Sequence, residues 1–443
     1  MIELDKLNEI QLTNLNKKYG LVSEIHDSFL VVSNILAPLN SIVRIQSKTN
    51  EEVFISGIIT KVSSNETIVS LFNKPFGITL NDKVILETEG IKIPKPETLI
   101  GEVVNPFGMP LFSDKKVIPE HDIMFSSNKN KFEDLAISEE QFITGVKAVD
   151  SFLPIVKGQR VSVNAGTGVG KTTFTSMLIK NAQSDIKIIA LIGERTREVI
   201  EFVQKELNND LTNTIVIAST SDDVPLMRKY AAITAIKLAS YFGKSKDVLL
   251  VMDSLTRASI AQREIGFSNG EIPVLGGFPQ SSFSFIPELL EEVGSTKNGS
   301  VTGFFTVLVD TEDEDDPITE TPLANYIRGI LDGHLFLDRK LAIKNVYPAI
   351  NVPYSISRMS KNIKDFNIQW QENINKIKKS LAIIDENKLL IDLGSYQPGM
   401  NAELDNALSL QNEVYNFISQ SGEHNSPLEE TLLLFNNLAN KII

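Results

Sequence analysis

The chain has 443 residues, 42% of them hydrophobic, which is enough to build sizeable cores in two or three domains. Its net charge of −13 argues against a general nucleic-acid-binding protein, because such a protein needs a basic surface to displace phosphate counterions. The absence of cysteine excludes disulfides and thiolate metal sites, and the four histidines have no metal-ligand spacing.

No apolar run is as long as a membrane-spanning helix requires, and the acidic first ten residues lack the apolar centre of a signal peptide. We therefore expect a soluble, cytoplasmic protein that is able to dock on a membrane complex. Residues 1–20 have weak helical spacing of leucine and isoleucine, which is typical of a partner-binding helix or of a frayed terminus.

Short apolar runs separated by turn residues follow, and they predict a small N-terminal β-barrel domain over residues 1–92. Residues 63–65 and 81–82 are interpreted as hairpin turns. Nothing in this part suggests catalysis. The candidate strands are residues 29–33, 41–45, 54–62, 67–72 and 83–87.

Apolar strands then alternate with helical stretches, which predicts an α/β domain over residues 93–352 with a mostly parallel sheet covered on both faces. Residues 353–443 have helical spacing and predict a C-terminal helical domain. The candidate strands are 186–193, 213–220, 247–254 and 300–310, and the candidate helices are 199–207, 224–242, 363–385 and 402–420.

Residues 159–173, QRVSVNAGTGVGKTT, contain the strongest motif in the chain, a strand followed by a glycine-rich turn and a helix. Such a loop turns backbone N–H groups toward phosphate oxygens, and the helix N-terminus adds a positive dipole end. Lys171 would reach the β- and γ-phosphates and the Thr172 hydroxyl would hold Mg²⁺. The alternative is a chance glycine turn, and Ala165 stands where the formal pattern has glycine. The predicted nucleotide-binding residues of the loop are Gly166, Thr167, Gly168, Val169, Gly170, Lys171, Thr172 and Thr173.

Two carboxylates follow predicted strands and are candidates for metal binding and catalysis, since ligands bind at the carboxyl ends of strands in such sheets. Asp253 could hold Mg²⁺, usually through water, although an Asp there also suits a helix cap. Glu194 could polarise the water that attacks the γ-phosphate. The competing interpretation pairs Glu194 with Arg195 or Arg197 at the surface.

Three further side chains have weaker signals. Arg257 lies four residues after Asp253, within reach of a γ-phosphate, and Arg358 could neutralise transition-state charge from a neighbouring subunit, although both also suit ordinary salt bridges. Tyr347 could stack on adenine or could be an ordinary residue of the hydrophobic core. The acidic run at 312–316 is typical of a solvated loop, with metal binding as a minor alternative.

Several longer motifs accompany these residues and occur in a fixed order along nearly the whole chain. Together they resemble the flagellar and type III secretion export ATPases, relatives of the catalytic β subunit of rotary ATP synthases. The motifs are QFITGVKAVDSFLPIVKGQR, NAGTGVGKTT, LIGERTREVIEF, LLVMDSLTRASIAQREIG, RGILDGHLFLDRKL, YPAINVPYSISRM and LGSYQPGMNAELDNAL.

The resemblance implies an N-terminal β-barrel, a RecA-like P-loop domain and a C-terminal helical domain, in a homohexameric ring with ATP sites between subunits. One departure is the segment 277–280, GFPQ, where relatives usually have Gly-Tyr-Pro-Pro in a loop thought to face the ring centre. The resemblance implies that Lys171 binds phosphate, that Thr172 binds Mg²⁺ and that Asp253 holds Mg²⁺ through water. It implies that Glu194 is the catalytic carboxylate and that Arg195 and Arg257 lie near the γ-phosphate. It also implies that Tyr347 stacks on adenine and that Arg358 is the arginine finger.

The function implied by the resemblance is Mg²⁺-dependent ATP hydrolysis that energises protein export. The implied partners are further copies of the chain, the export gate, a stalk, regulators and export substrates or chaperones, with no nucleic acid and with peripheral membrane association. One alternative is a catalytic β-type subunit of an ATP-synthase-like rotary motor. A Rho-like RNA motor is a further alternative, which the acidic charge balance disfavours.

Overall fold

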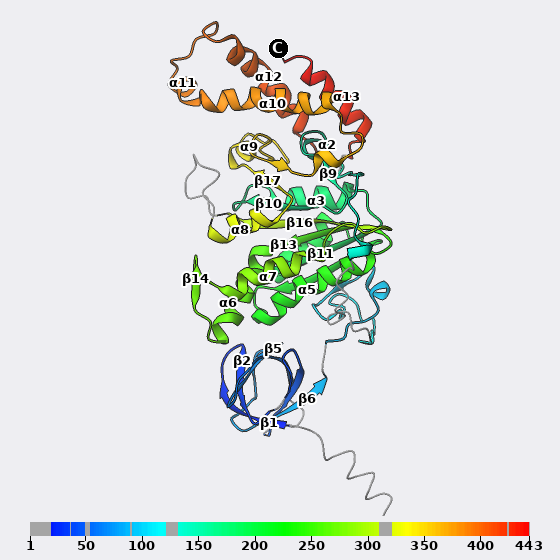
Figure 1. Ribbon diagram of the computed structural model, residues 1–443, viewed down its shortest axis with the longest axis vertical. Coiled ribbons are helices and arrows are strands. Elements are labelled where there is room, and N and C mark those ends of the chain that lie inside the picture. The colour runs from blue at the N-terminus through cyan, green and yellow to red at the C-terminus, as the bar shows by residue number, and fades with distance from the viewer. Residues whose placement is uncertain are drawn as a thin grey trace, which may run out of the picture.

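The computed structural model is an elongated molecule with three parts stacked along its long axis (Figure 1). A barrel lies at one end, an α/β layer structure in the middle and a group of helices at the other end. Residues 1–18 of the helix considered at 1–20 and the acidic run at 312–316 lie outside the described residues, and Tyr19 and Gly20 belong to a strand rather than to that helix. The structure describes residues 19–35, 37–48, 54–88, 91–120, 132–309, 321–422 and 425–442.

The N-terminal part is a closed barrel with the strand order β1-β2-β5-β4-β3-β6. Its strands alternate between buried aliphatic and more exposed side chains, as in β3, where Val43 and Ile45 are fully buried. Closure leaves no unpaired strand edge. The strands are β1 (Tyr19–Ile25), β2 (Phe29–Ser33), β3 (Ile42–Gln46), β4 (Phe54–Val62), β5 (Thr67–Leu71) and β6 (Lys83–Thr88).

One of the two predicted hairpin turns is wrong. The turn at 63–65 joins β4 to β5, which pair antiparallel. Residues 81–82 instead lead into β6, which pairs with β1 and β3 and not with the preceding strand β5. The buried Asp82 accepts hydrogen bonds from the backbone N–H groups of Thr79, at 2.7 Å, and of Lys48, at 3.0 Å. Asp82 therefore anchors the connection between β5 and β6 to the barrel instead of forming a hairpin turn.

The middle part is built on an eight-stranded sheet with the order β18-β17-β10-β16-β13-β11-β12-β7. All its neighbouring strands run parallel except β18, which is antiparallel to β17. The sheet strands are β7 (Val103–Val104), β10 (Arg160–Ala165), β11 (Ile186–Glu194), β12 (Thr214–Thr220), β13 (Asp247–Asp253), β16 (Ser300–Leu308), β17 (Gly333–Leu337) and β18 (Ile356–Ser357). Two small ribbons pair β8 (Gln141–Phe142) with β9 (Ile155–Val156), and β14 (Pro273–Leu275) with β15 (Phe278–Pro279).

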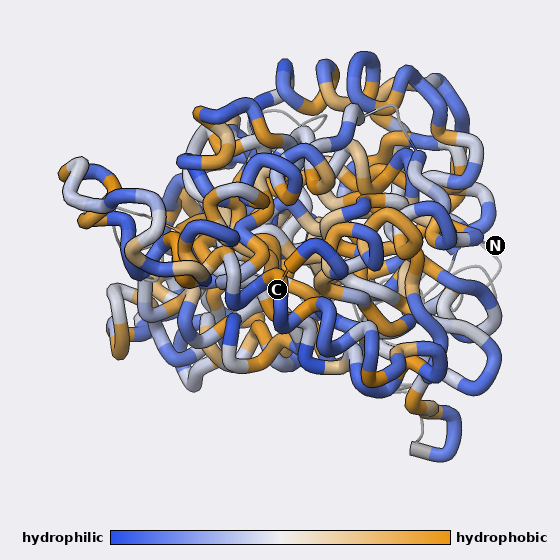
Figure 2. Tube along the Cα trace, turned by 90° about the horizontal axis from the view of Figure 1, so that it is seen from above, coloured by the Kyte–Doolittle hydropathy of each residue, from blue (hydrophilic) through white to orange (hydrophobic). Residues whose placement is uncertain are grey.

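Helices cover both faces of this sheet, so alternate side chains of one strand enter different cores. Ile189 and Leu191 of β11 join one hydrophobic cluster, whereas Ile188 and Ala190 join the other. Figure 2 shows the resulting distribution, with hydrophobic segments gathered inside and hydrophilic ones around them. The helices of this part are α2 (Lys147–Phe152), α3 (Lys171–Asn181), α4 (Thr196–Glu201), α5 (Pro225–Phe242), α6 (Leu255–Ser268), α7 (Gln280–Leu290), α8 (Pro322–Ile330) and α9 (Arg339–Ile343).

The single helix expected at 199–207 is two shorter elements, because α4 ends at Glu201 and one turn of π-helix, η3 (Phe202–Glu206), follows it. The described residues also form three short 3₁₀ turns. They are η1 (Pro96–Leu99), η2 (Phe132–Asp134) and η4 (Ser360–Asn362).

The C-terminal part consists of α10 (Ile368–Glu386), α11 (Lys388–Asp392), α12 (Ala402–Ile418) and α13 (Leu428–Ala439). Because β18 still pairs with the central sheet, we propose that the second domain boundary lies at 358–367, somewhat beyond the expected residue 352, and that the first lies near residue 92. Among the described residues, no helix has the length and apolar character needed to cross a bilayer.

Candidate functional site

The glycine-rich loop joins the end of β10 to the start of α3, as the sequence predicts. Gly168 and Gly170 have φ angles of 73° and 89°, in the left-handed region that favours glycine. A Cβ at Gly168 would meet nothing within 4 Å, so the loop is open on that side. Ala165 is the last residue of β10, in extended backbone that any residue adopts, which explains why glycine is not needed there.

Lys171 lies between two carboxylates at the carboxyl ends of neighbouring strands. Its Nζ donates to Asp253 Oδ1 at 2.7 Å and lies 3.8 Å from Glu194 Oε1. Thr306 on β16 also donates to Asp253 Oδ1, at 2.8 Å, and so fixes that carboxylate. The sheet order, in which β13 lies between β11 and β16, therefore brings together residues that are 82 positions apart in the chain.

Glu194 has a different arginine partner from those considered in the sequence. Arg257 Nη1 lies 3.0 Å from Glu194 Oε2 and also donates to the carbonyl oxygen of Gly193. Arg197 instead pairs with Glu201 at 3.2 Å. Arg195 is exposed at the N-cap of α4, with its backbone N–H bound to Glu198. The surface-pair interpretation of Glu194 thus loses its proposed partners.

Asp253 does not have the capping role considered for it. The N-cap of α6 is Ser254, whose hydroxyl accepts from the backbone N–H of Arg257 at 3.1 Å. The side chain of Asp253, which is 11% exposed, faces Lys171 rather than the helix backbone. Thr172 is exposed beside it at the start of α3.

Burial is the main cause that raises the pKa of Glu194 to about 7, and a hydrogen bond with Glu198 and the nearby charge of Asp253 act in the same direction. Lys171 and Arg257 oppose this shift. The same hydrogen bond lowers the pKa of Glu198, so Glu194 is the carboxyl of the pair that binds a proton more readily. Sequence reasoning missed Glu198, although it lies in the first turn of the helix that follows Glu194.

The pH dependence of kcat/KM is expected to reflect this carboxyl pair, because that parameter reports ionisations of the free enzyme. If Glu194 acts as an acceptor, kcat/KM for ATP rises with pH through a midpoint of about 7. Glu198→Gln replaces the charged acceptor with a neutral amide whose N–H groups can donate to ionised Glu194, so the midpoint moves to lower pH. Glu201→Gln, on the same helix, leaves it unchanged, and an unchanged midpoint in Glu198→Gln would contradict the coupling.

Tyr347 and Arg358 lie toward opposite ends of the sheet strands. The Tyr347 ring contacts the phosphate loop so closely that a Cβ added at Gly170 would come within 2.8 Å of its Cε1. Arg358 follows β18, and the register pairs Ser357 with Gly333 at the start of β17, whereas the loop begins beside Leu337 at its end. Gly333 and Leu337 are four residues apart along β17, so Arg358 and the start of the loop are separated by about 13 Å in the strand direction.

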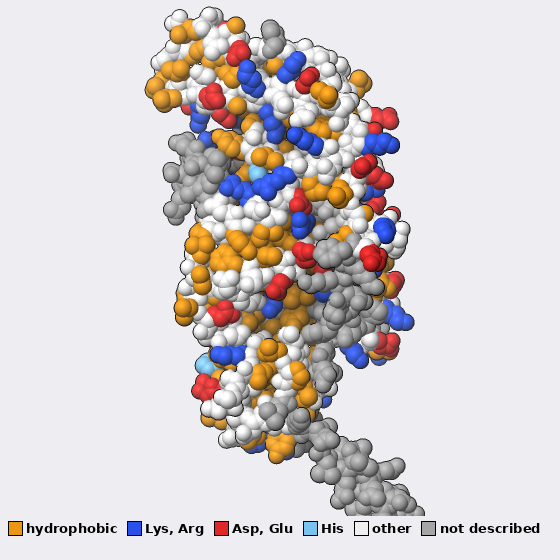
Figure 3. Space-filling view, viewed as in Figure 1, with side chains coloured by type: hydrophobic (Ala, Val, Ile, Leu, Met, Phe, Trp, Pro, Cys, Tyr) orange, Lys and Arg blue, Asp and Glu red, His pale blue; other side chains and the backbone are white. Residues whose placement is uncertain are grey.

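Arg358 is exposed, and its guanidinium donates to the carbonyl oxygens of Leu331, at 3.2 Å, and Arg328, at 3.5 Å. In Figure 3, blue Lys and Arg side chains gather on this face over β17. Arg328 and Arg358 also contribute to lowering the pKa of the nearby His334 to about 4, after the larger effect of burial. Arg358 therefore belongs to a basic surface away from its own phosphate loop.

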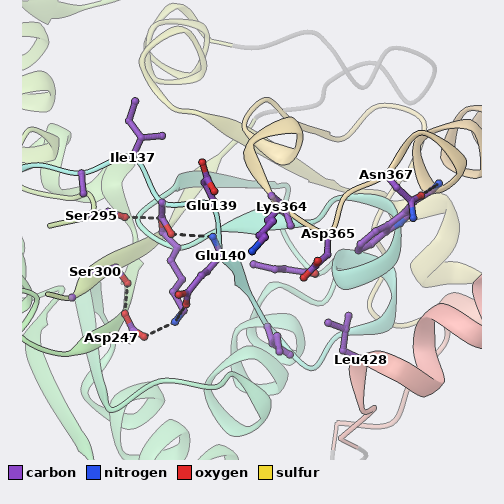
Figure 4. A pocket seen from close by; sticks show the side chains of 18 of the residues that line it. Ile137, Glu139, Glu140, Asp247, Ser295, Ser300, Lys364, Asp365, Asn367 and Leu428 are labelled. Carbon is purple, nitrogen blue, oxygen red and sulfur yellow. Dashed lines mark hydrogen bonds and ion pairs between the residues drawn. The ribbon is translucent and has the colours of Figure 1, made fainter. Parts of the chain in front are cut away.

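Two cavities are candidates for a nucleotide. A cleft of about 480 Å³ is lined by Lys171, Thr172 and Glu194 and by residues of α4 and η3. A wider cavity, about 1110 Å³, lies between central-domain residues such as Asp247 and C-terminal residues such as Leu428 (Figure 4). Its Lys157 is already bound by Glu140 at 2.6 Å and Asp247 at 2.7 Å, and the described residues that line it include no glycine-rich loop. The chemistry of phosphate binding therefore favours the first cleft.

A glycine loop with a lysine and two strand-end carboxylates, on a parallel sheet, defines a P-loop nucleotide-binding protein with a RecA-like architecture. Residues 145–357 match the ATP synthase alpha/beta family, nucleotide-binding domain. Residues 368–437 match the T3SS EscN ATPase C-terminal domain.

The chain belongs to the family of flagellum-specific ATP synthases and type 3 secretion system ATPases, and it is an ATPase. It is 37% identical to the flagellum-specific ATP synthase of Helicobacter pylori strain J99 over 94% of each chain. It is 32% identical to the type 3 secretion system ATPase of Xanthomonas euvesicatoria, covering 99% of this chain and 98% of the other. The assembled ATPase EscN of enteropathogenic E. coli has the same fold, with a TM-score of 0.85 and 31% identity over 95% of this chain and 100% of that one.

Proposed function

We propose that this chain hydrolyses ATP between the subunits of a homohexameric ring and that hydrolysis energises protein export through a flagellar or type III secretion apparatus. The relatives named for these systems match over nearly their full lengths. EscN has been described as an assembled ATPase and in a complex with its central stalk EscO, which supports self-assembly and a stalk partner here. We further propose a cytoplasmic location beside a membrane-embedded export gate.

The observation that supports ATP hydrolysis most strongly is the position of Lys171 between Asp253 and Glu194 at the start of α3. In the proposed complex, Lys171 and the loop N–H groups bind the β- and γ-phosphates. Glu194 accepts a hydrogen bond from the attacking water, and Arg257 stabilises negative charge beside it. Arg195 is exposed beside Glu198, the hydrogen-bond partner of Glu194, and is proposed to approach the γ-phosphate.

The proposed metal is Mg²⁺, held by the Thr172 hydroxyl and, through water, by Asp253. Among the residues described, no cluster of three acidic or histidine side chains forms a metal site. This fits Mg²⁺, which keeps several waters and is usually bound by few protein groups together with substrate phosphates. When bound, the ion would neutralise charge on the phosphate oxygens.

Arg358 is proposed to act on the site of the neighbouring subunit. Its place near the start of β17 keeps it from its own phosphate loop, which begins beside the end of that strand, and the residue is exposed. One chain then supplies Lys171 to one site and Arg358 to the next, as a homomeric ring requires.

Lys171→Ala tests the phosphate-binding proposal. Losing a charge-assisted contact to phosphate is expected to weaken ATP binding on the order of 10²-fold and to reduce hydrolysis with it. Lys180→Ala, near the other end of α3, is the matched control and should behave as the wild type. Binding of a fluorescent ATP analogue and phosphate release would be measured, and normal values for Lys171→Ala would remove the assignment.

A further inference from the structure

Gln420 follows α12 and joins the C-terminal helices to the central domain by three hydrogen bonds. Its side-chain oxygen accepts from the backbone N–H of Lys147 at 2.9 Å, and its side-chain nitrogen donates to the carbonyl of Gly145 at 2.7 Å. Its own backbone N–H donates to the carbonyl of Tyr347 at 2.8 Å. The residue is only 8% exposed, so these contacts are made out of water.

The turn that Gln420 holds lies against the far end of the phosphate-loop helix. A Cβ added at Gly145 would come within 2.6 Å of Asn181 Cβ, and Asn181 is the last residue of α3. The buried Asp150 carboxylate fixes the same turn by accepting from the backbone N–H groups of Thr144 and Gly145, each at 2.9 Å. Asp150 therefore keeps the turn, and the end of α3 that packs on it, in place without help from Gln420.

The third hydrogen bond of Gln420 connects it to the residue beside the phosphate loop. The carbonyl that it binds belongs to Tyr347, and the Tyr347 ring lies against Gly170, one residue before Lys171. Gln420 thus binds both the turn that packs on the end of α3 and the backbone of Tyr347, whose ring lies beside the loop.

We propose that Gln420 is a positioning residue that couples the arrangement of the C-terminal helices to the binding of the nucleotide base beside Tyr347. The inference rests on the proposed ATP site, and it adds Gln420 as a residue that connects the C-terminal helices to that site. A shift of α12 that pulls Gln420 away changes the position of Tyr347 and lowers affinity for the base, while the phosphate loop keeps its own contacts with the triphosphate. A partner that moves the C-terminal helices would therefore regulate nucleotide affinity through this joint.

Gln420→Ala separates this coupling from a merely structural role. We expect the KM for ATP to rise about tenfold, a typical size for coupling between sites, with kcat within about twofold of the wild-type value. The Kd for inorganic tripolyphosphate, which has no base, stays unchanged. Gln411→Ala, a glutamine on α12 bound to Tyr415 and away from the joint, is the matched control and keeps the wild-type KM.

If Gln420→Ala does not fold, Gln420→Glu is the second variant, because glutamate has nearly the same side-chain shape as glutamine. Gln420→Glu keeps the acceptor for Lys147 and loses the donor to Gly145, so it should show the same KM shift. An unchanged KM for ATP in a folded variant overturns the proposal, as does an equal loss of tripolyphosphate binding. If the wild type binds no ATP and is insensitive to Lys171→Ala, the proposed function itself has failed.

A double-mutant cycle tests whether Gln420 acts through Tyr347. If it does, Tyr347→Ala combined with Gln420→Ala has the same KM as Tyr347→Ala alone. Additive increases in KM would contradict this route.

Discussion

Replacing Glu194 with glutamine is expected to reduce ATP hydrolysis by about 10²- to 10⁴-fold, the usual contribution of a general acid or base. Glutamine has nearly the same shape but is a poor proton acceptor, so the cleft keeps its geometry while the attacking water loses its acceptor. ATP binding is retained, because Lys171 and the loop N–H groups make the phosphate contacts. Single-turnover phosphate release and equilibrium binding of ATP would be measured on the same preparation.

A control for this variant is Glu413→Gln, which removes a surface carboxylate bound to Lys441 on the C-terminal helices. It should hydrolyse ATP at the wild-type rate. Full activity of Glu194→Gln would remove the catalytic role, and loss of ATP binding would mean that Glu194 holds the nucleotide rather than the water.

Arg358→Ala is expected to lower hydrolysis by about 10³-fold, the lower end of the range for an arginine that stabilises phosphoryl-transfer charge. Binding of ATP by its own subunit is unaffected, because Arg358 lies at the opposite end of the strands from that subunit's phosphate loop. Arg358→Lys recovers little activity, since an ammonium group lacks the planar fork of the guanidinium. Hydrolysis rates and ring formation by native mass measurement would be compared across the variants.

Arg339→Ala is a control for Arg358→Ala, because Arg339 is exposed at the start of α9. It should leave hydrolysis unchanged. A wild-type rate for Arg358→Ala in assembled rings would exclude the arginine from the reaction.

The parts of the site that could be predicted are those that a local pattern specifies. The phosphate loop is readable because its glycines, lysine and flanking strand and helix are contiguous in the sequence. Asp253 and Glu194 follow apolar strands, and the rule that ligands bind at the carboxyl ends of parallel strands brings them to the same edge. The resemblance to the export ATPases then supplied the family, which the comparisons confirm.

The parts that could not be predicted depend on contacts between distant segments. Residues 81–82 look like a hairpin turn, but β6 pairs with β1 and β3, and pairing of that kind leaves no local signal. Glu198 gains its importance only when α4 brings it to Glu194. Gln420 is an ordinary polar residue in the sequence until the fold lays it against a turn about 275 positions away.

Mixing Arg358→Ala with Lys171→Ala subunits tests most directly whether a site is shared between neighbouring copies of the chain. Each variant alone has little activity, because every site in its ring lacks one of the two groups. In mixed rings, some sites combine an intact Lys171 from one subunit with an intact Arg358 from the next. The account predicts partial recovery of ATP hydrolysis that depends on the mixing ratio. No recovery in rings whose mixed composition is verified by native mass measurement would contradict it.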